Sequence, residues 1–275
     1  MAATQRKYRI GASELALVSG NVTPDVTALN WWKTFTKIYV RSFGYEDFMH
    51  LIGVDPELII SMSSSEEESQ IVIDERKVKQ DVETLKQSKA YKEMTTTGVA
   101  TSAFYDVVDE IKADQRAVGI VVEESRVKAG ILKKNNNRCY GKDYVHPSAK
   151  KEPVFVHLFA YVDGENEDGS LVEEKTRKYR AVYEKSVPLY ERIQMAVILY
   201  VTERKTIHHV QHFCEDTRTE TFSRSELVPQ LARMMKPFIE MLKRTDFADK
   251  FRTELTLTEK NDIVTYAGTL MAPLR

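Results

Sequence analysis

Two short apolar runs joined by an Asp-Gly turn constrain the fold of this chain more than any other feature. Residues 154–163 are apolar and aromatic with rough alternation, and residues 170–176 resume the pattern after Asp168-Gly169. Alternation with a period of two is typical of strands, and Asp-Gly between such runs is a strong hairpin signal. The sequence therefore predicts two adjacent antiparallel strands.

Helical spacing of apolar residues dominates the rest of the chain. Apolar positions that recur every three or four residues are typical of helices that bury one face. They predict helices at 13–18, 30–39, 81–94, 105–131 as one helix or two, 187–201 and 225–244, the last with Ser225 as its N-cap. Residues 207–213 favour a further strand. The order helix, strand, strand, helix, strand indicates an α/β fold with a central mixed sheet flanked by helices.

Length, charge and cysteine content limit the class of protein. A chain of 275 residues with 42% hydrophobic content can form one domain, and 40 Lys and Arg against 41 Asp and Glu leave no global field that favours nucleic acid or a membrane. Cys139 and Cys214 are too few for a disulfide framework, so we expect free, buried thiols. With neither an apolar leader nor ~18 consecutive apolar residues, we expect a soluble intracellular protein without a membrane partner.

The second strand of the hairpin carries the residues with the clearest chemistry. Side chains on a strand alternate between faces, so Glu173 and Lys175 share one face and Glu174 lies on the other. Asp163 closes the preceding strand, and the hairpin can bring it alongside at about one strand spacing, ~5 Å. The sequence therefore predicts two carboxylates and one ammonium at one place.

This grouping suits metal-assisted phosphodiester hydrolysis. Mg²⁺ prefers oxygen ligands and keeps several waters, so two carboxylates can hold it, and a bound metal polarises the scissile phosphate and lowers the pKa of a water. Lys175 would hold or help deprotonate the nucleophile and offset negative charge in the transition state. The alternative is a surface hairpin with an exposed Glu-Lys pair.

Four segments match, in order, the motifs of one nuclease family. They are RIGASE at 9–14, GIVVE at 119–123, DG at 163–164 followed by GSLVEEKT at 169–176, and Tyr190 with Gln194. They resemble the R-I-G-x-S-[DE] helix start, the G-x-x-x-E helix, the hairpin ending in E-x-K-T and the Y-x-x-x-Q helix of the lambda-exonuclease and YqaJ-type viral recombinase branch of the PD-(D/E)XK nucleases. The resemblance covers residues 6–20 and 115–215.

The resemblance implies a restriction-endonuclease-like core and a role for each matching residue. Asp163 and Glu173 would bind Mg²⁺ or Mn²⁺ directly, with the backbone carbonyl of Glu174 as a further ligand. Lys175 would be the catalytic lysine, and Gln194 would face the site and support it. The alternative for Gln194 is a core amide bonded to backbone.

Further positions would contact metal or DNA. Glu123 would bind the metal directly or through water; alternatively Glu124 takes its place, or Glu123 is a solvated helix carboxylate. Ser13 would bind a terminal 5′-phosphate with Arg6 or Arg9, unless it is a simple helix cap. A basic path for the DNA backbone would continue along Arg177, Lys178 and Arg180.

The chain departs from the family pattern at two places. Tyr161-Val162 stands where the family often has Ser-Pro before the aspartate. About a hundred residues separate Ser13 from Gly119, more than a compact member needs. Residues 50–105 are therefore predicted to form an insertion or helical subdomain of a single nuclease domain, 1–275, and residues 220–275 a C-terminal helical extension.

Two other groups have a structural interpretation beside a functional one. His208 and His209 point to opposite faces of the predicted strand, so with His212 they favour a structural or surface role over metal binding. Trp31 and Trp32 fall at helical core spacing, although stacking on a nucleic-acid base is the alternative.

The resemblance implies a 5′ to 3′ exonuclease on duplex DNA ends in recombination or DNA processing, with a single-strand annealing protein as partner and a homo-oligomer as assembly. If the protein is viral, the host cytoplasm or nucleus would be its location. The alternatives are an endonuclease or single-strand nuclease of the same fold, and a non-catalytic nucleic-acid-binding or virion protein.

Overall fold

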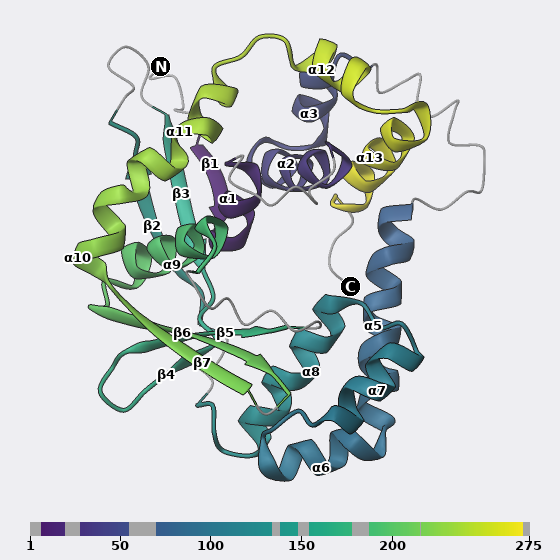
Figure 1. Cartoon of the computed structure of the whole chain (residues 1–275). Coiled ribbons are helices and arrows are strands. Elements are labelled where there is room, and N and C mark those ends of the chain that lie inside the picture. Colours follow the sequence, from purple (N-terminus) through teal and green to yellow (C-terminus); the bar gives the residue numbers. More distant parts are fainter. Residues whose placement is uncertain are drawn as a thin grey trace.

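The protein has a mixed α/β fold, as the pattern of helices and strands predicts. The computed structural model describes residues 7–19, 28–54, 70–133, 138–147, 154–177, 187–214 and 216–271 (Figure 1). Its strands are β1 (Lys7–Gly11), β2 (Tyr140–Val145), β3 (Phe155–Ala160), β4 (Gly164–Glu165), β5 (Leu171–Thr176), β6 (Thr206–Phe213) and β7 (Asp216–Ser223).

These strands form two mixed sheets, so the prediction of one central sheet is wrong. One sheet has the order β1-β3-β2, with β1 parallel and β2 antiparallel to β3, and the other has the order β4-β5-β6-β7. The first apolar run forms β3 of one sheet and ends before β4 begins at Gly164. It does not pair with residues 171–176, so the prediction that the two runs form adjacent strands is wrong; the hairpin partner of β5 is the two-residue β4. Gly164 lies so close to Leu132 that a Cβ there would come within 2.4 Å of the leucine Cδ1.

The Asp168-Gly169 turn is confirmed. β4 and β5 pair antiparallel over two residues, and the amide of Asn166 donates to the carbonyl of Ser170 at 2.8 Å. Gly169 has a φ of +78°, in the left-handed region that glycine adopts without strain. The turn aims β5 back along β4 and into a parallel pairing with β6.

The first core, defined as the larger buried cluster, surrounds the β1-β3-β2 sheet. Trp32 and Phe35 are completely buried in it, and Trp31 stacks on Phe35 with ring centroids 5.1 Å apart, so the core interpretation of both tryptophans is confirmed. The helices that build this core are α1 (Ala12–Val18), α2 (Ala28–Phe43), α3 (Tyr45–Ile52), α9 (Leu189–Thr202), α11 (Leu231–Leu242), α12 (Phe247–Glu254) and α13 (Leu257–Thr269).

The C-terminal part begins with a strand, which corrects the predicted all-helical extension. Residues 216–223 pair antiparallel with β6 along their whole length. Ser223, not Ser225, is the helix cap: its Oγ accepts from the amide of Glu226 at 3.1 Å at the start of α10 (Arg224–Leu227). A 3₁₀ turn, Val228–Gln230, follows at Pro229 and separates α10 from α11.

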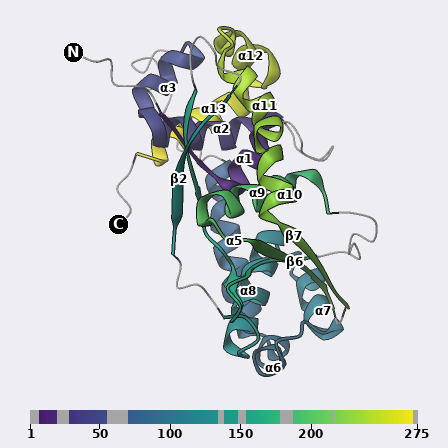
Figure 2. The same cartoon turned by 90° about the vertical axis from the view of Figure 1, so that its left-hand side faces the viewer.

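A second core lies within the helices α5 (Gln70–Gln87), α6 (Lys89–Thr97), α7 (Ser102–Glu110) and α8 (Gln115–Lys128). Leu85, Phe104 and Val121 are among its buried side chains. Figures 1 and 2 show these helices gathered at the end of the molecule opposite α2, α3 and α12. These helices fall partly within the segment 50–105 that was predicted as an insertion or helical subdomain, and they continue to Lys128, while residues 55–69 lie outside the described part.

The expectations from composition are met in part. Cys139 and Cys214 are free, but Cys139 is exposed and Cys214 only half-buried, so the prediction of buried thiols is wrong. In the described residues, no helix is long and apolar enough to span a membrane.

Candidate active site

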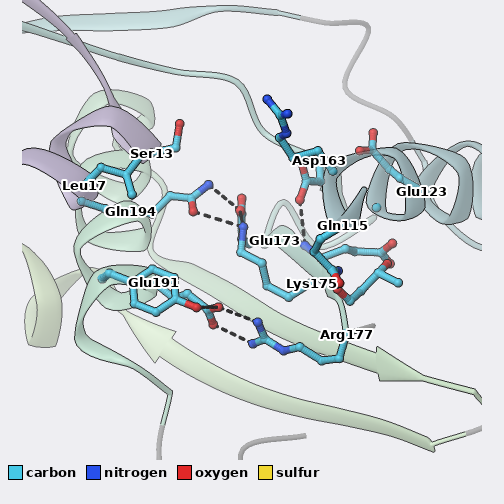
Figure 3. Close-up of a pocket in the computed structure, with 16 residues that line it drawn as sticks. Ser13, Leu17, Gln115, Glu123, Asp163, Glu173, Lys175, Arg177, Glu191 and Gln194 are labelled. Atoms are coloured by element: carbon cyan, nitrogen blue, oxygen red, sulfur yellow. Dashed lines mark hydrogen bonds and ion pairs between the residues drawn. The ribbon is translucent and has the colours of Figure 1, made fainter. Parts of the chain in front are cut away.

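A cavity of about 620 Å³ lies where α1, α8 and α9 meet β5. Its lining brings together eight of the candidate residues from the sequence: Ser13, Glu123, Asp163, Glu173, Glu174, Lys175, Arg177 and Gln194. Figure 3 shows Glu173, Lys175 and Gln194 pointing toward one another, with Glu123 on the far side of Asp163 from α9.

Strand periodicity decides which side chains of β5 enter this cavity. Glu173 and Lys175 face α9, where both contact Gln194. Glu174 faces the other way and accepts a hydrogen bond from Arg126 Nε at 2.9 Å. The shared face of Glu173 and Lys175 therefore follows from the alternation in the sequence.

The two carboxylates differ in how the protein holds them. Asp163 Oδ2 accepts the backbone amide of Glu174 at 2.8 Å, which ties the residue before β4 to the middle of β5. Glu173 is 2% exposed, and its Oε1 accepts from Lys175 Nζ and from Gln194 Nε2. Its Oε2 is buried and has no hydrogen-bond partner among the described residues. One oxygen of Glu173 is thus held by two donors, and the other has no donor from the described residues.

Gln194 orients both charged groups through its single amide. Its oxygen accepts from Lys175 Nζ at 3.1 Å, and its nitrogen donates to Glu173 Oε1 at 2.5 Å. These two contacts determine which way the amide points, because a lysine can only donate and a carboxylate can only accept. The site-facing placement that the resemblance implied for Gln194 is the one observed.

The electrostatics of the cavity oppose charge on Asp163 and favour it on Lys175. Burial, together with the negative charges of Glu173 and Glu123, raises the pKa of Asp163 well above its usual value, against the attraction of Lys175. Burial alone would lower the pKa of Lys175, but the charges of Glu173 and Asp163 raise it. Lys175 is therefore an ammonium that can donate hydrogen bonds but cannot accept a proton.

The residues present fit a hard divalent cation. Within the described ranges no three His, Cys, Asp or Glu side chains are grouped to hold a metal by themselves. Mg²⁺, however, is commonly held by only one or two carboxylates plus waters and substrate phosphates. Glu173 and Asp163 are such a pair of carboxylates: Oε2 of Glu173 has no hydrogen-bond partner among the described residues, and the negative charge of Asp163 is disfavoured. A cation between them would stabilise both charges.

We expect Asp163→Asn to raise the stability of the metal-free protein by about 1 kcal/mol at pH 7. A carboxyl whose pKa is raised on folding contributes most to stability below its unfolded pKa, and that contribution is lost as pH rises through the folded pKa. At neutral pH the charged carboxylate is therefore a cost, which the amide removes. Urea unfolding in EDTA measures the difference.

The control for this prediction is the same measurement in saturating Mg²⁺. Metal binding to the folded state should stabilise the wild type and not Asp163→Asn. The difference in free energy of unfolding between the two proteins should therefore become smaller or change sign. A variant that is less stable than the wild type in EDTA would contradict the electrostatic account.

A buried ion-pair network lies next to the catalytic candidates, and the sequence did not reveal it. Glu191 is 1% exposed, and its carboxylate accepts hydrogen bonds from both terminal nitrogens of Arg177, at 2.7 and 2.9 Å. It also lies 2.8 Å from Nε2 of the completely buried His209. Arg177 also donates to Gln211 Oε1 at 2.8 Å. Burial would raise the pKa of Glu191, but hydrogen bonds from His209 and Arg177 lower it to about 2. The one sequence signal for this network was Glu191 itself, a single carboxylate within the apolar run 187–201.

This network changes the expected role of Arg177. The guanidinium faces α9 rather than solvent and is committed to Glu191 and Gln211, because a buried carboxylate needs a cationic partner. Arg177 therefore joins β5 to α9 and is not a cation on an open basic path. Lys178 and Arg180, the other two positions of that path, lie outside the described residues.

The remaining acidic candidates, Glu123, Glu124 and Glu174, differ in whether they face the cavity. Glu123 is half-buried, lines the cavity, and is near enough to Asp163 to raise its pKa. Glu124 instead pairs with Lys86 at 2.6 Å, so the rotated-helix alternative is not observed. Glu174 reaches the cavity through its backbone amide, and a role for its carbonyl stays a prediction.

The predicted phosphate residues border a second cavity of about 700 Å³ that adjoins the first. Ser13 is the second residue of α1, is exposed, and lines both cavities. The N-cap of α1 is Gly11, so Ser13 is not the simple cap of the alternative interpretation. Arg9 is exposed and lines the second cavity, whereas Arg6 lies outside the described residues.

The three histidines of β6 have structural roles, as the sequence favoured. His208 lies 2.8 Å from Thr221 Oγ1, His209 belongs to the Glu191 network, and His212 contacts Thr217 Oγ1 at 3.1 Å.

Comparison with known proteins adds little to this geometry. No family model and no curated protein matches the chain. Among solved structures, the one titled "Crystal structure of SSO0001" is similar, with 11% sequence identity and a TM-score of 0.39 over 66% of this chain and 93% of that chain. A similarity at this level establishes neither family nor activity.

Proposed function

We propose that the protein is a divalent-metal-dependent DNA nuclease with a PD-(D/E)XK core. The state of Glu173 carries the proposal: one oxygen holds Lys175 and Gln194, and the other is buried without a hydrogen-bond partner among the described residues, next to Asp163. The path from β5 through α9 to the parallel β6 supports such a core, because it places a helix over the face that carries Glu173 and Lys175.

Each residue then has a distinct task. Asp163 and Glu173 would hold Mg²⁺ or Mn²⁺, with Glu123 binding through water, and the bound metal would polarise the scissile phosphate and lower the pKa of a water. Lys175, as an ammonium, donates to the phosphate oxygens and offsets the negative charge that builds in the transition state. Gln194 holds Lys175 and Glu173 in that geometry.

The proposed substrate is a duplex DNA end, degraded from 5′ to 3′. Ser13 and Arg9 support this, since both line the cavity that adjoins the metal-binding carboxylates, and a hydroxyl with a guanidinium suits a terminal phosphate. The formal net charge of −1 is compatible with DNA binding only if the cations are local in this way.

Linear duplex and covalently closed circular duplex of the same sequence, incubated with Mg²⁺, test the need for an end. We expect linear DNA to be degraded to mononucleotides, faster when its ends carry 5′-phosphate, and circular DNA to persist. Cleavage of both forms at similar rates would make the protein an endonuclease. If linear, circular and single-stranded DNA all survive, the catalytic proposal fails and a nucleic-acid-binding protein remains.

A further inference from the structure

The second cavity is continuous with the proposed catalytic site. It shares Ser13, Asp163 and Gln194 with the catalytic cavity, and its volume of about 700 Å³ leaves room for part of a substrate. A strand whose phosphate lies at Asp163 therefore has to place a neighbouring nucleotide either in solvent or in this second cavity.

Tyr161 contributes an exposed aromatic ring to this cavity. Its side chain is 59% exposed, whereas the ring of Phe159 is covered by the guanidinium of Arg41, 4.8 Å from its centroid. Cys139 also lines the cavity, and its thiol is near enough to the Tyr161 hydroxyl to raise the pKa of that hydroxyl. Arg9 lines the same cavity and offers an exposed cation for a phosphate.

The position of Tyr161 in the chain sets it apart from an ordinary exposed tyrosine. It stands two residues before Asp163, and two residues of extended chain span at most about 7 Å. Tyr161 and Asp163 are therefore close enough in the chain for their side chains to reach adjacent nucleotides of one strand. Two other cations that line the cavity, Lys37 and Arg41, are paired with Glu14.

We propose that Tyr161 stacks on the base of a nucleotide that flanks the scissile phosphate, and that the second cavity is a nucleobase-binding subsite. The inference rests on the proposed nuclease function for the identity of the ligand. Base-aromatic stacking tolerates any sequence, because every base has a π face. The subsite would therefore grip the substrate strand without selecting a sequence.

The first test pairs a change in the protein with a change in the DNA. We expect Tyr161→Ala to raise KM for linear duplex about 10-fold with kcat nearly unchanged, and Tyr161→Phe, which keeps the ring and loses the hydroxyl, to change KM less than about 3-fold. Replacing the nucleotide on one side of the cleaved bond by an abasic one should raise KM of the wild type by the same factor. It should not raise KM of Tyr161→Ala any further. Leu257→Ala, at a residue that is 68% exposed on α13, is the control.

The second test does not depend on cleavage. Fluorescence of 2-aminopurine placed at the flanking nucleotide, titrated with protein in EDTA, should be quenched by wild type and Tyr161→Phe and not by Tyr161→Ala. Quenching without cleavage would keep the subsite and reject the nuclease. The subsite would be rejected and the nuclease kept if Tyr161→Ala cleaves DNA with the KM of the wild type. The same conclusion would follow if the abasic substrate raises KM of Tyr161→Ala as much as it raises KM of the wild type. No binding and no cleavage would reject both.

Discussion

Lys175→Ala is expected to lower kcat for DNA cleavage by about 10³-fold. Lys175 contacts Glu173 and Gln194 within the cavity, and its pKa is raised by the neighbouring carboxylates, so it brings a positive charge to the place where the phosphate becomes more negative. Alanine removes that charge from a partly buried site, where it acts more strongly than in water. Single-turnover cleavage of end-labelled linear duplex in Mg²⁺ measures the loss.

The matched control is Lys236→Ala. Lys236 is 61% exposed on α11 and pairs at 3.5 Å with Glu240, a surface ion pair of small energetic value. This variant should cleave DNA at the wild-type rate. Circular dichroism should show that both variants are folded. A folded Lys175→Ala protein that keeps more than about a tenth of the wild-type kcat would exclude the proposed role of the lysine.

Glu191→Ala should lower the free energy of unfolding by about 3–5 kcal/mol. Removing this carboxylate leaves the guanidinium of Arg177 without its bidentate partner and removes the contact of the completely buried His209. In a chain of this length the loss corresponds to a fall in Tm of roughly 10 °C. Urea unfolding gives the free energy, and Glu240→Ala, at a residue that is 63% exposed, should change it by less than about 0.5 kcal/mol.

The same residue gives a pH dependence with a definite sign. The folded pKa of Glu191 is about 2, below the ordinary value of 4.5, so its stabilisation is present above pH 4.5 and is lost as pH falls toward 2. The wild type should therefore lose about 3 kcal/mol more than Glu191→Ala between pH 5 and pH 2. Parallel pH profiles for the two proteins would show that the carboxylate is not the titrating group.

Local signals explain what the sequence predicted well. The alternation of residues 170–176 determines which side chains of β5 share a face, and Asp168-Gly169 supplies the turn conformation that a hairpin needs. The apolar spacing of α2 and α9 likewise follows from a single amphipathic or buried helix. These features depend on neighbours within a few residues, so they are visible without knowledge of distant contacts.

Long-range pairing explains what the sequence did not predict. β1 has only five residues, and its partner is β3, some 150 positions away, so nothing in Lys7–Gly11 alone indicates a strand. Gly164, where the chain enters the second sheet, lies against Leu132, a long-range contact that no local pattern records. Strand formation is more context-dependent than helix formation for this reason.

The candidate site divides in the same way. The grouping of Asp163, Glu173 and Lys175 was predictable because strand geometry and one turn determine it. The pairing of Arg177 with Glu191 was not, since it requires α9 to cross β5 at a particular height. A basic residue after a lysine looks like part of a DNA-binding path until the buried carboxylate opposite it is known.

The central claim is that Asp163, Glu173 and Lys175 form a metal-dependent phosphodiesterase. The most direct measurement is release of acid-soluble nucleotides from linear duplex DNA by the purified wild type, in Mg²⁺, in Mn²⁺ and in EDTA, beside Glu173→Gln. We predict release with either metal, none in EDTA, and none above background from the variant. Equal release in EDTA, or an active Glu173→Gln protein, would contradict the claim.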